Sequence, residues 1–168
     1  DYIKAYVQPK VDMHNGHIIG GEALVRWQND KEMIYPDQFI PVLEKNGYVI
    51  DVDNFIWNKV CACIKMMEDK GIEPVPISVN VSRMHVYQEN LKNMAGEYGI
   101  DPKYIPLEIT ESAFTKEEGS LFKKVQSLQG YGFKFSMDDF GSGYSSLGML
   151  KSERVDEVKI DKTFVDDI

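Results

Sequence analysis

The sequence predicts an α/β fold, a TIM-like (β/α)8 barrel with an antiparallel first strand. Short apolar, β-branched runs alternate along the chain with longer segments that carry apolar residues every three or four positions, which is typical of alternating strands and helices. Strand after strand also ends in a carboxylate or an amide. A length of 168 residues corresponds to one domain, so we expect residues 1–168 to form a single unit.

Six runs are expected to form strands, and they cover residues 5–12, 17–27, 75–82, 105–110, 133–139 and 157–161. The turn His14-Asn15-Gly16 contains the Asn-Gly pair of tight hairpins, so the first two strands should be antiparallel. From residue 17 onward strands and helices alternate, which favours a parallel sheet. A complete barrel has eight strands, so six strands predict a barrel truncated before its last two.

Helical periodicity marks the segments between the strands. We expect helices that begin near Pro36, cover residues 51–69 and 86–97, and run from a capping-box pattern at Thr115 to Gly130, with a short helix after Gly143. Trp57 is expected to pack in the core or at its rim, and the three histidines are scattered and receive no catalytic role.

Composition excludes several classes of protein. With 27 acidic and 19 basic residues the net charge is −8, which disfavours binding to a DNA or RNA duplex. No apolar run reaches the roughly 20 residues of a membrane span. Two cysteines give no disulfide framework, so a cytoplasmic domain is expected.

The polar residues at the strand ends are the candidate site. Glu22, Asn80, Glu108, Asp138 and Lys159 lie late in separate strands, and parallel strands end on the same face of a barrel, where active sites lie. A cluster of oxygen ligands favours Mg²⁺ or Mn²⁺. The adjacent Asp138 and Asp139 suit two ions, an arrangement used for attack of water on phosphodiesters, and Lys159 could neutralise phosphate charge or hold the water.

Each of these residues alone has a structural explanation. Glu22 could form a salt bridge at a sheet edge, Asn80 a turn, and Lys159 an ordinary surface contact. The loop over residues 138–147, with Gly141 and Gly143, could be a flexible connection or a loop that orders around metal and substrate. The combination at the strand ends favours the functional interpretation.

These residues lie in six motifs that closely resemble the EAL domain, the bacterial cyclic-di-GMP phosphodiesterase. The motifs are YVQPKVD (6–12), GGEALVRW (20–27), SVNVS (78–82), LEITES (107–112), MDDFGSGYSSL (137–147) and VKIDKTFV (158–165). They occur in the order of the family and cover the whole chain, so together they are specific.

The resemblance implies metal-dependent hydrolysis of cyclic-di-GMP to linear pGpG. It implies roles for ten residues: Glu22, Asn80, Glu108 and Asp138 as metal ligands with Asp139 on a second ion, Lys159, Glu111 and Asp139 in catalysis, and Gln8, Leu24 and Arg26 at the dinucleotide. In this interpretation Lys159 contacts the nucleophilic water or the phosphate. Glu111 holds the loop after Asp139.

The sequence departs from the family at its end. A later catalytic glutamate and a glutamine of the family have no counterpart before Ile168, so we expect little turnover from this chain alone. The family also implies a homodimer, formed through the helix near the Asp138-Asp139 loop, and fusion to a GGDEF or sensory domain, in a protein that is free or membrane-anchored. Two alternatives stay open: a non-hydrolysing cyclic-di-GMP receptor or protein-interaction module, and a metal-dependent barrel enzyme acting on carboxylate substrates.

Overall fold

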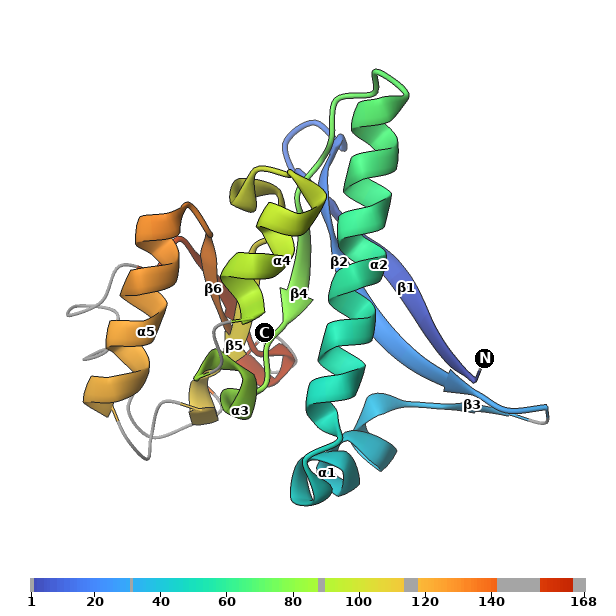
Figure 1. Cartoon of the computed structure of the whole chain (residues 1–168). Helices are drawn as coiled ribbons and strands as arrows, with labels where there is room; N and C mark the ends of the chain where they lie inside the picture. Colours follow the sequence, from blue (N-terminus) through green and yellow to red (C-terminus); the bar gives the residue numbers. More distant parts are fainter. Residues whose placement is uncertain (1, 31, 88–89, 114–117, 142–154, 165–168) are drawn as a thin grey trace.

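The chain folds into a curved, mostly parallel sheet with helices on its outer face (Figure 1). The computed structural model describes residues 2–30, 32–87, 90–113, 118–141 and 155–164. The sheet has seven strands: β1 (Ile3–Val11), β2 (Ile18–Gln28), β3 (Met33–Ile34), β4 (Ile77–Asn80), β5 (Leu107–Thr110), β6 (Phe135–Phe140) and β7 (Glu157–Ile160). All six expected strands are confirmed, and only the two-residue β3 was not anticipated.

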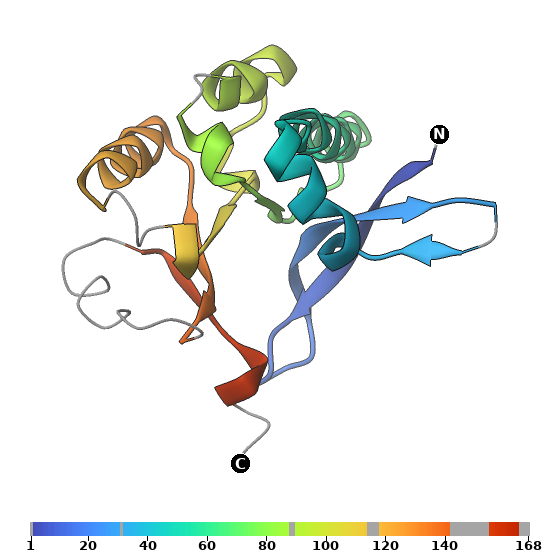
Figure 2. The same ribbon diagram turned by 90° about the horizontal axis from the view of Figure 1, so that it is seen from below.

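Strand order follows the chain, β1-β2-β4-β5-β6-β7, with β3 paired to β2. The hairpin of β1 and β2 is antiparallel, as predicted, and its register places Gln8 opposite Glu22. The strands from β2 through β4, β5, β6 and β7 pair in parallel. Viewed from below, the sheet curves around an inner face and the helices lie outside it (Figure 2), which is the arrangement of a barrel wall.

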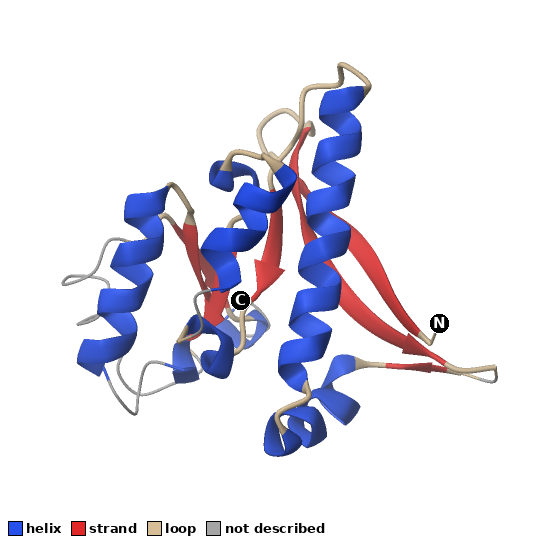
Figure 3. Ribbon diagram, viewed as in Figure 1, coloured by secondary structure: helices blue, strands red, loops and turns tan. Residues whose placement is uncertain are grey.

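The helices lie between consecutive strands (Figure 3). They are α1 (Pro36–Asn46), α2 (Val49–Asp69), α3 (Arg83–Val86), α4 (Asn90–Tyr98) and α5 (Glu118–Tyr131), with short 3-10 turns at Pro102–Tyr104, Glu111–Ala113 and Lys162–Phe164. None of the helices in the described ranges is both long enough and apolar enough to cross a bilayer.

Alternation of side chains along the strands separates an apolar layer from a polar one. The buried core consists of outward residues such as Val79, Ile109 and Met137, which pack with Trp57 and Ile64 of α2 and with other helical residues. The intervening residues on the inner face are polar. The curvature of the sheet therefore gathers polar side chains on the face that the helices leave uncovered.

One expectation about helices changed, and two others fall mainly on residues that the structure does not describe. The single helix expected over 86–97 is wrong, because α3 ends at Val86 and α4 begins at Asn90. Val86, Leu91 and Met94 are all buried, so the apolar periodicity continues across the break and could not reveal it. The capping box that begins at Thr115 lies mostly outside the described residues, as does the expected helix after Gly143.

Candidate active site

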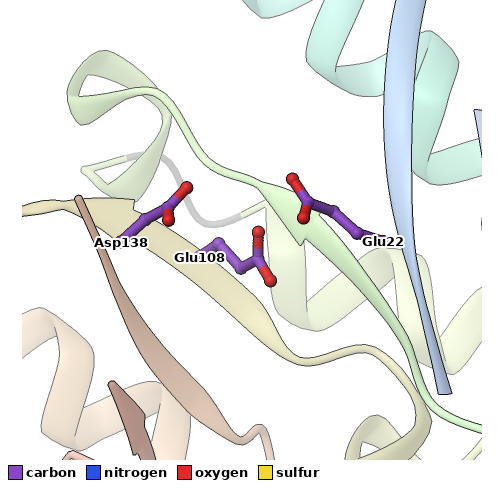
Figure 4. Close-up of side chains that lie close together, drawn as sticks. All are labelled: Glu22, Glu108 and Asp138. Atoms are coloured by element: carbon purple, nitrogen blue, oxygen red, sulfur yellow. The ribbon is translucent and has the colours of Figure 1, made fainter. Parts of the chain in front are cut away.

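Three carboxylates converge on the inner face of the sheet. Glu22 of β2, Glu108 of β5 and Asp138 of β6 each offer one oxygen, and these oxygens all lie within 4.8 Å of one another. Figure 4 shows the three side chains pointing toward a common point. The predicted convergence is therefore confirmed for these residues.

Lys159 of β7 lies at the centre of this carboxylate cluster. Its Nζ is 2.8 Å from Oε2 of Glu108, 3.0 Å from Oε2 of Glu22 and 3.1 Å from Oδ1 of Asp138. Burial alone would lower the pKa of Lys159, but hydrogen bonds and charge from Glu108, with Glu22 and Asp138, raise it above its usual range. One fixed cation thus offsets the repulsion among three carboxylates.

Glu108 is held from two sides. Its side chain is fully buried, and while Oε2 accepts from Lys159, Oε1 lies 3.0 Å from Nζ of Lys10 on β1. Lys10 also pairs with Glu157 of β7 at 3.2 Å. Burial by itself raises the pKa of Glu108, but Lys159, Ser78 and Lys10 outweigh it and hold that pKa below its usual range. This pKa shift favours the ionised form of Glu108 despite its burial.

Asn80 and Asp139 lie beside this cluster. Nδ2 of Asn80 is 3.5 Å from Oε1 of Glu22, so the amide borders the same space. Asp139 has a positive φ of 54°, and its backbone N–H donates to Oδ1 of Asp138 at 3.0 Å. Burial together with the neighbouring Asp138 and Asp161 raises the pKa of Asp139. The carboxylate of Asp139 is not one of the three clustered acids.

Glu111 lies just after β5 and is fully buried. Its Oε2 accepts a hydrogen bond from the backbone N–H of Gly141 at 2.9 Å. Gly141 has a φ of 98°, a conformation that residues with a Cβ rarely adopt. Glu111 thereby ties the end of β6 to the segment that follows β5.

A cavity of about 580 Å³ opens beside the carboxylates. Its walls include Glu22 and Asp138 at one end, and Leu24, Ile40 and Val52 among the apolar residues of β2, α1 and α2. Of the three residues expected at a dinucleotide, Leu24 lines this cavity, whereas the other two are not among its lining residues. Gln8 is exposed opposite Glu22. Arg26 donates to the carbonyl oxygen of Val25 at 2.8 Å and lies 5.3 Å from the ring centre of Tyr35.

Comparison with known proteins identifies the family. The model described as "EAL domain" matches residues 1–168. The chain is 34% identical over 169 residues to the oxygen sensor protein DosP of Escherichia coli, a match covering 98% of this chain and 21% of DosP. It is 32% identical over 168 residues to the bifunctional diguanylate cyclase/cyclic di-GMP phosphodiesterase MucR of Pseudomonas aeruginosa, covering 97% of this chain and 24% of MucR.

The chain belongs to the EAL domain family. A solved structure of the MucR phosphodiesterase in complex with c-di-GMP superimposes with a TM-score of 0.90 at 32% identity, covering 99% of this chain and 69% of that one. The chain spans about one fifth of the length of the curated relatives named above. The TIM-like barrel predicted from the strand pattern is the fold of these neighbours, here with its antiparallel first pair.

The carboxylate cluster of this EAL domain suits a divalent cation. Its donor atoms are all oxygens, as Mg²⁺ and Mn²⁺ prefer. The ammonium group of Lys159 lies among these oxygens, so the cluster stabilises a positive charge. Glu22, Glu108 and Asp138 could hold an ion, with Asn80 at its border.

Sequence reasoning missed Lys10 and Glu157. Lys10 follows Gln8 by two residues and therefore lies on the same face of β1, so strand periodicity could have placed it near the site. No pattern along the chain indicates that it reaches Glu108 and Glu157, because that contact depends on the curvature of the sheet.

Proposed function

We propose that this EAL domain hydrolyses one phosphodiester bond of cyclic-di-GMP to give linear pGpG, using Mg²⁺ or Mn²⁺. The convergence of Glu22, Glu108 and Asp138 around one cation-binding point carries the proposal. The likeness to a phosphodiesterase structure in complex with c-di-GMP supports the choice of substrate.

In this proposal Glu22, Asn80, Glu108 and Asp138 hold the first ion, and Asp139 holds a second one. The ions, when bound, lower the pKa of a water and stabilise negative charge on phosphate oxygens. Glu22, Glu108 and Asp138 would hold the ion at the place where Nζ of Lys159 now lies 2.8–3.1 Å from all three. The ammonium group of Lys159 would then be free to contact the attacking water or a phosphate oxygen.

The remaining residues position the substrate and the loop. Glu111 fixes Gly141 and with it the segment that follows Asp139. The apolar wall at Leu24 offers a surface for a base. Gln8 and Arg26 would contact the dinucleotide, and the guanidinium of Arg26 has the planar fork that suits phosphate.

We further propose that the domain works as a homodimer in the cytoplasm, within a longer protein that carries a GGDEF or sensory domain. The relatives are about four to five times as long as their matched segment, which supports a multidomain setting. Light scattering of the purified chain tests the dimer, which a monomer at working concentration would refute.

Hydrolysis of cyclic-di-GMP with Mn²⁺, followed by chromatography, tests the activity. The assay uses this chain and a longer version of the same protein that spans the length of the MucR phosphodiesterase chain, with Asp138→Asn as the inactive control. We expect pGpG from the longer version and little from this chain. Nucleotide binding without any product in either version would instead establish a receptor.

A further inference from the structure

Side chains of helix α2 form hydrogen bonds with the backbone of the turn that carries Asn80. Trp57, which is 0% exposed, donates its indole N–H to the backbone oxygen of Asn80 at 3.2 Å. Asp53, one helical turn earlier, accepts a hydrogen bond from the backbone N–H of Ser82 at 3.2 Å. Two side chains of one helix thus bind the backbone of Asn80 and of the residue two positions later.

His85 completes this group. Its ring is fully buried and stacks on Trp57, with ring centres 4.0 Å apart and an angle of 24° between the planes. Nδ1 of His85 lies 3.1 Å from Oδ2 of Asp53, and Nε2 has no hydrogen-bond partner within the described ranges. This geometry favours the tautomer that carries its proton on Nδ1, because a carboxylate can only accept a hydrogen bond. We refer to Asp53 and Trp57 of α2, together with His85 of α3, as the α2 brace.

A brace made only for packing would not need these polar atoms. Burying a carboxylate and an imidazole is unfavourable unless both are hydrogen-bonded. Here each of these hydrogen bonds joins a residue of the brace either to the backbone of the turn or to another residue of the brace. The polar atoms therefore fix the backbone on both sides of Val81, while the side chain of Asn80 extends toward Glu22.

We propose that Asp53, Trp57 and His85 are positioning residues that set the side chain of Asn80 for the divalent cation. None of them belongs to the carboxylate cluster. The inference rests on the metal site of the proposed function. Residues that orient a metal ligand typically change metal affinity or activity by about 10–100-fold when they are replaced.

The first test replaces Trp57 by phenylalanine, which keeps a ring to stack on His85 and removes the N–H donor to Asn80. The matched control is Ile64→Val, which trims a fully buried apolar side chain of the same helix that carries no hydrogen-bonding group. Melting temperatures in EDTA serve to compare the stability of the two variants. Electron paramagnetic resonance measures free Mn²⁺. We expect the dissociation constant for Mn²⁺ to rise about tenfold in Trp57→Phe and to stay unchanged in Ile64→Val. Equal Mn²⁺ affinity in both variants and the unaltered chain would overturn the proposal.

The second test leaves Asp53, Trp57 and His85 unaltered and follows the indole N–H of Trp57 directly. The chain has two tryptophans, so its ¹H–¹⁵N spectrum contains two indole signals, and the absence of one in Trp27→Phe assigns them. During a Mg²⁺ titration the Trp57 signal should shift with the midpoint of ion binding, because its acceptor is the backbone of a metal ligand. A Trp57 signal that stays in place while Mg²⁺ binds refutes the brace. A chain that binds neither Mg²⁺ nor Mn²⁺ refutes the metal site itself, and the brace with it.

Discussion

Replacing Lys159 with methionine should destabilise the metal-free protein and strengthen its binding of divalent cations. Methionine retains much of the length of the side chain but leaves Glu22, Glu108 and Asp138 without their shared cation. In the unaltered chain an incoming ion must displace the Nζ that lies 2.8–3.1 Å from these carboxylates. Removing that competitor leaves Lys10 beside Glu108 but no cation beside Glu22 and Asp138, so an incoming ion relieves more repulsion than in the unaltered chain.

The size of the effect follows from the geometry. Opposite charges about 4 Å apart interact by about 4 kcal/mol at an effective dielectric constant near 20, and breaking a buried pair costs about 3–5 kcal/mol. The side chain of Lys159 is 23% exposed and those of Glu22 and Asp138 are 18% and 17% exposed, so we take the lower value, about 3 kcal/mol. For a domain of this size that loss corresponds to a fall of about 6–12 °C in melting temperature.

Differential scanning calorimetry in EDTA and then in Mn²⁺ measures both effects. The matched control is Lys103→Met, which breaks an ion pair with Asp101 at 2.9 Å and should change the melting temperature little, because solvent screens an exposed pair. We expect the rise in melting temperature on adding Mn²⁺ to be larger for Lys159→Met than for the unaltered chain or the control. In the longer version of the protein, Lys159→Met should abolish hydrolysis because the proposed role of Lys159 at the phosphate is lost.

Two results would refute this reasoning. A melting temperature of Lys159→Met in EDTA equal to that of Lys103→Met would mean that Lys159 does not relieve repulsion in the cluster. A Mn²⁺-induced rise no larger than in the unaltered chain would mean that Lys159 and the ion do not compete for one place.

Three further predictions concern metal binding by Asp138, the backbone at Gly20 and the acid stability that depends on Asp156. Asp138→Asn should weaken Mn²⁺ binding by at least tenfold in calorimetric titration, whereas Cys61→Ala should bind as the unaltered chain does; undiminished binding by Asp138→Asn removes this residue from the metal site. Gly20→Ala should lower the free energy of unfolding by about 1–3 kcal/mol in urea titrations, because its Cβ would lie 2.8 Å from the carbonyl oxygen of Pro76. An unchanged urea midpoint would show that the backbone at Pro76 shifts without a cost in stability. The pKa of Asp156 lies below its usual range, because hydrogen bonds from the backbone N–H of Phe135, from Lys134 and from Gln129 outweigh the effect of partial burial. The stabilisation from Asp156 is therefore fully present above its pKa in the unfolded chain, near 3.9. It is lost as the pH falls through the lower pKa in the folded chain. Asp156→Asn should flatten the acid limb of stability below about pH 4, and an acid limb identical to that of the unaltered chain would contradict this assignment.

Most of the fold could be predicted because its signals are local. The apolar runs of the strands and the helical periodicity of α2 follow from which residues are adjacent or one turn apart. The Asn-Gly turn indicated the antiparallel hairpin for the same reason. The division between α3 and α4 could not be predicted, since both helices bury apolar residues at compatible spacing.

The sequence by itself also determined which polar residues end the strands, and parallel pairing then required Glu22, Glu108 and Asp138 to share one face. Only the tertiary structure decided how the charges are distributed there. Lys10 meets Glu108 and Glu157 because the sheet curves far enough to bring β1 toward β7, and Trp57 meets Asn80 because α2 packs across the end of β4. Register and periodicity are properties of the chain taken one segment at a time, whereas curvature and helix placement result from packing all the segments together.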